Sequence, residues 1–252
     1  MRLPYEVKEL VHDMEYDCDK QSRAGTHVIR WYDNNKAYYL KMNQNTCEVL
    51  REHNMYRWLG AKLPLPEVVY EGMEDGKRYL LIQEVKGTIL AKGNYLDEPE
   101  RVVRLAASGI LMLQSLQIDN CPYYSDIDSK IEKAKERLQL GLVKEVTKNE
   151  YTEEFDDFEE MLEYLEHNKP EEEFVFSHGD YCFNNYFSDG EKITGFIDLG
   201  RAGIADRYQD IATCVRDLMR YDPSYTVLFF ELLGLEPDYE KLKYFIVLDE
   251  FF

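Results

Sequence analysis

One segment of this 252-residue chain decides its fold, and it reads Phe176-Ser-His178-Gly179-Asp180-Tyr-Cys-Phe-Asn-Asn185-Tyr-Phe-Ser-Asp-Gly-Glu-Lys-Ile-Thr-Gly-Phe-Ile-Asp198-Leu-Gly-Arg201. The turn signal Asp189-Gly190 lies between two short runs rich in aromatic and β-branched residues, which predicts an antiparallel hairpin. Asn185 opens the first strand and Asp198 closes the second. Because antiparallel pairing returns both ends to one side, we expect these two side chains to meet Asp180 at the open end.

These three oxygen-bearing side chains match the needs of magnesium-dependent phosphoryl transfer. Mg²⁺ takes carboxylate, amide and phosphate oxygens and uses only one or two protein carboxylates. Asp180 precedes Asn185 by five residues, the interval of the kinase catalytic loop, where an Asp receives the hydroxyl proton and an Asn holds metal. Any one Asp after a strand is equally well explained as a helix cap or turn residue. The joint spacing of all three favours a site.

Charge and composition limit the classes of partner. The chain has 49 acidic and 30 basic residues, a net charge of -19, which disfavours nucleic acid and favours a cationic partner. An acidic surface also aids solubility, so charge alone names no substrate. No apolar run approaches the length of a membrane span, and the start of the chain has no signal-peptide core, so we expect a cytoplasmic protein. The five widely spaced cysteines fit reduced thiols rather than structural zinc.

Hydrophobic patterning divides the chain into a sheet-rich first part and a helical second part. Alternating or aromatic-rich runs predict strands at 26–31, 37–42, 68–71 and 78–83, and helical spacing marks 45–59. Residues 84–87 are interpreted as a connector. Helical patterns then follow at 99–116, 129–140, 152–166, 206–220 and 239–250.

The deciding segment resembles the aminoglycoside 3'-phosphotransferase family, bacterial kinases related in fold to protein kinases. The resemblance continues in Tyr39-Leu-Lys41-Met, Lys62-Leu-Pro-Leu-Pro-Glu-Val68, Asp206-Arg-Tyr-Gln-Asp-Ile-Ala-Thr-Cys-Val-Arg-Asp-Leu218 and the ending Tyr244-Phe-Ile-Val-Leu-Asp-Glu-Phe-Phe252. It implies an α+β, bilobal protein-kinase-like fold. The N-lobe, 1–84, would bind nucleotide through an antiparallel sheet with one main helix. The mostly helical C-lobe, 85–252, would carry the catalytic hairpin and the aminoglycoside site, with a hinge at 84–87.

The resemblance implies transfer of the γ-phosphate of ATP or GTP to a hydroxyl, the 3'-OH, of a cationic aminoglycoside, giving antibiotic resistance. Asp180 would be the catalytic base, while Asn185 and Asp198 would hold Mg²⁺. Two alternatives remain open: a kinase of another small alcohol or amino sugar, and a catalytically weak homologue that binds nucleotide or drug. No obligate protein partner is inferred.

The resemblance also implies the nucleotide contacts. Lys41 would bind the α- and β-phosphates with Glu52 as its ion-pair partner, and Tyr39 would stack on adenine. The base edge would pair with the carbonyl of Gln83 and the amide of Val85. The alternative is that Lys41 extends from an edge strand to solvent and Glu52 is a solvated helix residue. In the nucleotide loop 21–28, Ala24 stands where the family has a Ser.

Substrate binding, on the same resemblance, falls to acidic groups that match ammonium groups: Asp180, Glu150, Asp249, Glu250 and the terminal carboxylate of Phe252. Thr147 stands where a second acid is expected near Glu150, which leaves the spectrum of drugs open. The alternative is that Asp249 and Glu250 form a solvated helix end and that Glu150 is a loop charge. Outside these contacts, we expect Asp210 to brace the catalytic loop by hydrogen bonds and His178 to be structural.

Overall fold

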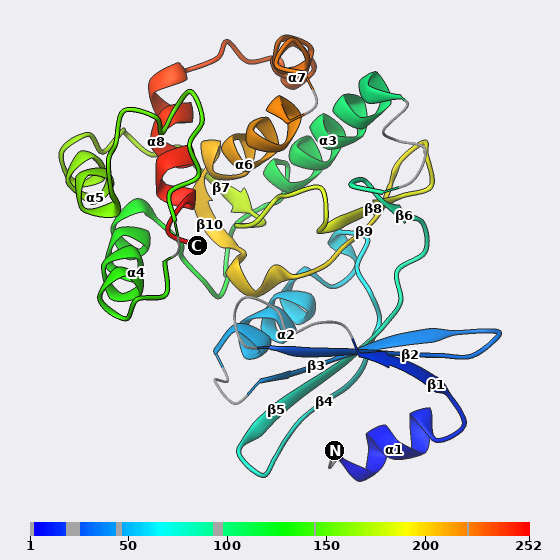
Figure 1. The fold of residues 1–252 in the computed structure, drawn as a ribbon. Helices are drawn as coiled ribbons and strands as arrows, with labels where there is room; N and C mark the ends of the chain where they lie inside the picture. The colour runs from blue at the N-terminus through cyan, green and yellow to red at the C-terminus, as the bar shows by residue number, and fades with distance from the viewer. Residues whose placement is uncertain (1–2, 19–25, 44–46, 93–97, 144, 221) are drawn as a thin grey trace.

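A five-stranded antiparallel sheet forms most of the first part of the chain in the computed structural model, which describes residues 3–18, 26–43, 47–92, 98–143, 145–220 and 222–252 (Figure 1). In sequence its strands are β1 (Glu15–Cys18), β2 (His27–Tyr32), β3 (Ala37–Asn43), β4 (Val68–Glu74) and β5 (Lys77–Gln83), and in space their order is β1-β2-β3-β5-β4. The turn between β4 and β5 is Asp75-Gly76, and both residues have positive φ, 51° and 73°. Two positive φ angles match the twist of a two-residue hairpin, which explains the Asp-Gly pair.

The two faces of this sheet have different functions. One face packs against α1 (Tyr5–Val11) in a small apolar cluster that includes Val7, Leu40 and Leu81. Because side chains alternate along a strand, Lys41 points to the opposite face, where α2 (Cys47–Leu59) lies between the sheet and the rest of the molecule (Figure 1). The sheet therefore directs a lysine toward the second part of the chain. We call the sheet with α1 and α2 the N-lobe, and the part from β6 onward the C-lobe.

The C-lobe is mainly helical. Its helices are α3 (Pro99–Gln114), α4 (Ile127–Gln139), α5 (Phe158–His167), α6 (Tyr208–Met219), α7 (Tyr225–Leu233) and α8 (Tyr239–Asp249). An aspartate caps the start of α4, α5 and α8 by accepting a hydrogen bond from the backbone amide three residues later, at 2.8–3.0 Å. No helix within the described ranges combines the length and the apolar character needed to cross a membrane.

Two small sheets lie where the lobes meet. Strand β7 (Phe174–Ser177) pairs with β10 (Gly203–Asp206), while β6 (Thr88–Ile89), β8 (Tyr186–Ser188) and β9 (Ile193–Phe196) form a three-stranded sheet. The connector that follows β5 packs on this second sheet, since a Cβ on Gly87 would lie 2.6 Å from the Ser188 carbonyl oxygen. Gly87 also has a φ of 116°, a conformation that only glycine adopts readily. The predicted hinge thus leads into β6, which pairs with strand β8 of the hairpin.

The predicted elements are present, with three corrections. Helix α5 begins at Phe158 rather than at 152, because the Asp157 side chain caps it there and the Thr152 hydroxyl donates to the Thr147 carbonyl. The hairpin turn is a four-residue loop, 189–192, in which Asp189 Oδ1 accepts from the amides of Glu191 and Lys192. The helix expected from 206 begins at 208, because 203–206 form β10. Strand β1 and helix α7 were not predicted.

Candidate active site

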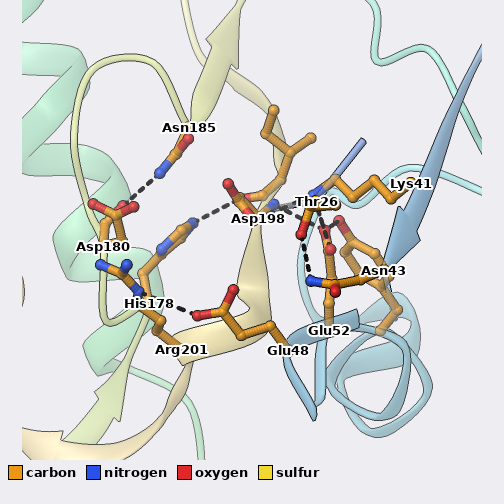
Figure 2. A network of polar contacts seen from close by, with 12 residues as sticks. Thr26, Lys41, Asn43, Glu48, Glu52, His178, Asp180, Asn185, Asp198 and Arg201 are labelled. Carbon is orange, nitrogen blue, oxygen red and sulfur yellow. Dashed lines mark hydrogen bonds and ion pairs between the residues drawn. The ribbon is translucent and has the colours of Figure 1, made fainter. Parts of the chain in front are cut away.

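A cleft of about 620 Å³ runs between the lobes and contains most of the predicted site. N-lobe residues of its lining include Thr26, Lys41, Glu48 and Glu52, and C-lobe residues include Asp180, Asp198, Arg201, Asp217, Asp249 and Glu250. Asp180 and Asp198 therefore face one shared cavity. Asn185 is buried just beside it, with its side-chain Nδ2 2.8 Å from the Asp180 carbonyl oxygen (Figure 2).

Three charged side chains connect the two lobes across this cleft (Figure 2). Lys41 Nζ lies 2.8 Å from both carboxylate oxygens of Glu52 and 3.2 Å from Asp198 Oδ1. Glu52 is only 2% exposed, and its Oε1 also accepts from the Tyr56 hydroxyl and from the Asp198 amide. The alternative of a solvent-exposed lysine and a solvated glutamate is therefore wrong.

The electrostatics of this group favour the charged forms of Lys41 and Asp198. Burial alone would lower the pKa of the Lys41 ammonium, but the carboxylates of Asp198 and Glu52 outweigh it and raise that pKa above its ordinary value. The same ammonium lowers the pKa of Asp198 below its usual range. A lysine held charged between two carboxylates suits the binding of a polyanion such as a nucleotide phosphate.

The backbone at Asp198 has a left-handed conformation, with φ 63° and ψ 45°. This conformation turns the chain sharply after β9 and presents a side chain that is 57% exposed in the cleft. The preceding residue, Ile197, is held through its carbonyl oxygen, which lies 2.9 Å from His178 Nε2. A carbonyl can only accept, so His178 carries its proton on Nε2 and has the structural role that we predicted.

The loop that carries Asp180 is braced from helix α6. Buried Asp210 accepts hydrogen bonds from the Ser177 hydroxyl and from the amides of His178 and Gly179, at 2.7–2.9 Å. Gly179 has a φ of 80°, and a Cβ there would lie 2.3 Å from the Arg201 carbonyl oxygen. The predicted bracing role of Asp210 is confirmed, and the glycine before Asp180 is required by both conformation and space.

The residues at the open end of the hairpin fit magnesium better than a metal that needs a full protein cage. The described residues contain no group of three or more His, Cys, Asp or Glu side chains arranged to hold a metal ion. Mg²⁺ needs few protein ligands, because phosphate oxygens and waters complete its octahedron. Asp198 offers a carboxylate to the cleft. The amide nitrogen of Asn185 donates to the Asp180 backbone, which leaves its oxygen as the atom suited to a cation.

The residues predicted to contact the base lie at the connector end of the sheet, outside the described lining of the cleft. Tyr39, on β3, is half-buried, and its hydroxyl lies 3.3 Å from Glu84 Oε1. Gln83 ends β5, and Val85 packs closely on Gly195 of the hairpin. Their roles stay predictions. Most of the nucleotide loop with Ala24 lies outside the described residues.

Arginine side chains lie among the acidic residues predicted to bind substrate, which the sequence did not suggest. Asp249 is only 9% exposed and forms an ion pair with Arg216, and Glu250 Oε2 accepts from the Thr147 amide at 3.0 Å. Phe252 lies beside Arg201, whose Nη2 is 3.3 Å from its carbonyl oxygen. Even so, the charged residues that line the cleft are eight acids and five bases.

The acidic residues that line the cleft differ from those predicted. Glu150 is exposed and is absent from the described lining of the cleft, whereas Glu145 and Thr147 belong to it. Glu48, at the start of α2, also lines the cleft, with its Oε1 3.9 Å from Arg201 Nε. Arg201 and Glu48 were missed, although Arg201 follows Asp198 by three residues and Glu48 precedes Glu52 by one helical turn.

Comparisons with known proteins agree with this geometry. The model of a phosphotransferase enzyme family matches residues 26–245. An aminoglycoside 3'-phosphotransferase from Enterococcus faecalis is 39% identical over 262 aligned positions, covering 100% of this chain and 99% of that protein. The chain belongs to the aminoglycoside phosphotransferase family. A second member, from Niallia circulans, is 37% identical over 99% of the chain and 97% of its own length.

Solved structures of this family share the fold of the new member. The crystal structure of a type VIII aminoglycoside 3'-phosphotransferase superposes with a TM-score of 0.84 at 26% identity, covering 98% of both chains. An aminoglycoside phosphotransferase from Streptomyces rimosus, solved in complex with ADP and streptomycin, has a TM-score of 0.82 at 20% identity, over 98% of this chain and 96% of its own. The predicted α+β kinase-like fold is confirmed, and the chain is a phosphotransferase.

Proposed function

We propose that this phosphotransferase moves the γ-phosphoryl group of ATP to the 3'-hydroxyl of an aminoglycoside antibiotic and thereby gives resistance to it. The observation that carries the proposal is the cleft in which Asp180, Asp198 and the Lys41–Glu52 pair meet from both lobes. The names of relatives that are 37–39% identical over nearly their whole length support the same substrate class. ATP is plentiful in the cytoplasm, where we place the reaction.

The chain's residues divide the work of phosphoryl transfer among them. Lys41, held by Glu52, binds the oxygens of the two phosphates that do not react. Asn185 and Asp198 would hold Mg²⁺, which neutralises charge on the phosphate oxygens when bound. Little covalent chemistry is asked of the protein, since positioning and charge neutralisation supply most of the acceleration in this class of reaction.

Asp180 provides the proton acceptor. The drug hydroxyl oxygen forms a bond to the γ-phosphorus while the bond from that phosphorus to the β,γ-bridging oxygen breaks, and ADP leaves. The hydroxyl proton passes to the Asp180 carboxylate. The bracing of this loop by Asp210 keeps the carboxylate at a fixed place, and general-base catalysis of this kind contributes roughly 10²–10⁴-fold.

The acidic end of the cleft suits a substrate with several ammonium groups. Charge-assisted hydrogen bonds from such groups to carboxylates are stronger than neutral ones. Glu250, Asp249 and Asp180 are our proposed contacts. Glu145, which lines the cleft, is a better candidate than the predicted Glu150 for the part of the site formed by the loop before α5.

The decisive experiment incubates the protein with ATP, Mg²⁺ and a panel of aminoglycosides and locates the added phosphate by ³¹P and ¹H NMR. We expect phosphate on the 3'-oxygen of kanamycin and no product with a 3'-deoxy drug, with Asp180→Asn as the inactive control. GTP in place of ATP reports the nucleotide preference. Turnover confined to another small alcohol or to a simple amino sugar would favour the metabolic kinase instead. Nucleotide binding without turnover on any acceptor would favour the catalytically weak homologue.

A further inference from the structure

One face of helix α2 contacts the segment that follows Asp198. Residues 48, 51 and 52 are spaced i, i+3 and i+4, so their side chains share a face of the helix. Glu52 accepts from the Asp198 amide at 3.1 Å, and Glu48 lies opposite Arg201. Between them, Arg51 faces the backbone of the same segment, and this arginine has no part in the proposed mechanism.

The Arg51 guanidinium spans from the N-lobe to two segments of the C-lobe, 200–202 and 123–125. Its Nε donates to the Gly200 carbonyl oxygen at 3.0 Å, and its Nη2 makes longer contacts with the Ala202 carbonyl at 3.4 Å and the Ser125 hydroxyl at 3.5 Å. Its cation lies 4.1 Å from the ring centroid of Tyr123, a close cation–π contact. Lysine could not reproduce this planar, multi-donor arrangement.

Two further contacts show that this junction is tightly built. Asn54, one turn further along α2, donates to the Tyr123 hydroxyl at 2.7 Å. A Cβ added to Gly200 would lie 3.1 Å from the Glu48 carbonyl oxygen, closer than most Cβ contacts, so the segment lies directly against the helix backbone. The helix is thus fixed to the C-lobe through hydrogen bonds, an aromatic contact and close backbone packing.

The segment after Asp198 is also short. A single 3₁₀ turn, Leu199–Arg201, leads to β10 at Gly203, and α6 begins at Tyr208. In regulated protein kinases, a long loop follows the equivalent aspartate, and phosphorylation of that loop assembles the Lys–Glu pair and the metal-binding Asp. Here the connection between Asp198 and α6 is only nine residues long, 199–207, and Arg51 binds two of its backbone carbonyls. Most of this connection is already in a 3₁₀ turn or in β10, so a modification would have little of it to order.

We propose that Arg51 is a positioning residue for phosphoryl transfer. It fixes α2 and the segment 198–202 against each other, so that Lys41, Glu52 and Asp198 form their ion-pair group without an activating partner or modification. The roles of Lys41 and Asp198 in this inference rest on the proposed function. The assembly of the group itself can be tested through nucleotide binding alone.

The test compares Arg51→Met with Arg57→Met, which removes an exposed arginine from the same helix. Calorimetric titration with ADP and Mg²⁺ measures the dissociation constant, and hydrogen exchange followed by mass spectrometry measures the protection of the peptide that contains Asp198. For Arg51→Met we expect nucleotide binding to weaken about 10-fold and that peptide to exchange faster, since charge-assisted hydrogen bonds of this kind typically contribute at that level. Arg57→Met should match the wild type in both measurements.

Kinetics with kanamycin separate positioning from loss of fold. Arg51→Met should lower kcat/KM for ATP about 10- to 100-fold at a fixed concentration of folded protein, with the KM for kanamycin within twofold. Arg51→Lys should recover part of the loss, and Gly200→Ala should shift both nucleotide binding and kcat/KM in the same direction without any change in charge. A role in folding alone would lower the melting temperature and leave the dissociation constant unchanged.

A double-mutant cycle identifies the route. If Arg51 acts through Glu52, the combination of Arg51→Met with Glu52→Gln should weaken nucleotide binding by less than the product of the two single effects. Fully multiplicative effects, or an Arg51→Met protein that matches Arg57→Met in binding and exchange, would overturn the inference. If the wild type phosphorylates no aminoglycoside, the proposed function fails, while the binding and exchange data still decide the role of Arg51.

Discussion

Lys130 is a buried lysine whose charge should make this protein more stable as the pH rises into the alkaline range. It lies on α4, 7% exposed, with its ammonium 5.4 Å from the centroid of the Phe252 ring. Burial lowers its pKa to about 8 from an ordinary value of 10.5. The carboxylates of Asp249 and Asp210 act in the opposite direction, and the cations of Arg201 and Lys133 add to the lowering.

The sign follows from counting protons. Between pH 8 and pH 10.5 the unfolded chain binds a proton at this lysine that the folded chain has lost, so the free energy of unfolding rises with pH across that window. The fall in the pKa of Lys130 from 10.5 to about 8 corresponds to about 3 kcal/mol. Below pH 8 the folded protein bears this cost in full. Lys130→Met removes the buried charge, keeps the volume and loses a cation–π contact of about 1 kcal/mol.

We therefore expect Lys130→Met to be more stable than the wild type by about 2 kcal/mol at pH 7, and this advantage should disappear by about pH 10. Urea denaturation of both proteins at pH 7, 8, 9 and 10 measures the difference between their free energies of unfolding. Both proteins contain the same tyrosines, so the titration of those tyrosines contributes equally to both and does not affect the difference. Lys77→Met, at an exposed position on β5, is the control and should give a flat difference. A wild type that is the more stable protein at pH 7, or a difference independent of pH, would refute the reasoning.

Three further changes test the cleft. Asp180→Asn should bind ADP normally but lose about 10²–10⁴-fold in kcat, and a loss below tenfold would remove Asp180 as the base. Lys41→Met leaves buried Glu52 without its cation, so urea denaturation should show that the free energy of unfolding falls by about 3 kcal/mol, and kinetics should show a raised KM for ATP. The double variant with Glu52→Gln should recover part of that stability. No recovery would contradict the ion pair. Gly179→Ala places a Cβ against the Arg201 carbonyl at a positive φ, so thermal melting should occur at lower temperature, and an unchanged melting temperature would contradict the close approach.

The parts of this protein that local sequence determines were predictable. The Asp75-Gly76 pair marks its hairpin because both residues adopt the positive φ angles that a two-residue turn needs. At Asp189-Gly190 only the glycine has a positive φ, and the loop is two residues longer than this pair suggested. Hydrophobic periodicity located the long helices to within a few residues. Helix α5 was the exception, because two neighbouring acids, Asp156 and Asp157, read as helix residues until one of them is seen to cap it.

What sequence could not supply depends on contacts between distant segments. Strand β10 is four residues long, and its partners are distant in sequence: β7, about thirty residues earlier, and Tyr124, which forms a bridge with Ile204. The same limit applies to the cleft. The Lys41–Glu52 pair was expected only because the chain resembles a known family, since a lysine on a strand and a glutamate on the next helix do not by themselves indicate a pair. Arg216 as the partner of Asp249 depends on how α6 packs on α8.

The left-handed backbone at Asp198 restricts which side chains could ever replace it. A longer acid such as glutamate would keep the charge but is poorly suited to a positive φ, and a β-branched residue would clash outright, while asparagine would keep the conformation and lose the charge. Aspartate alone among the standard residues combines a carboxylate with tolerance of this geometry. The need for a carboxylate and the left-handed backbone conformation thus favour the same residue at this position. A library of variants randomised at codon 198 should therefore return aspartate even at a low concentration of the selecting antibiotic.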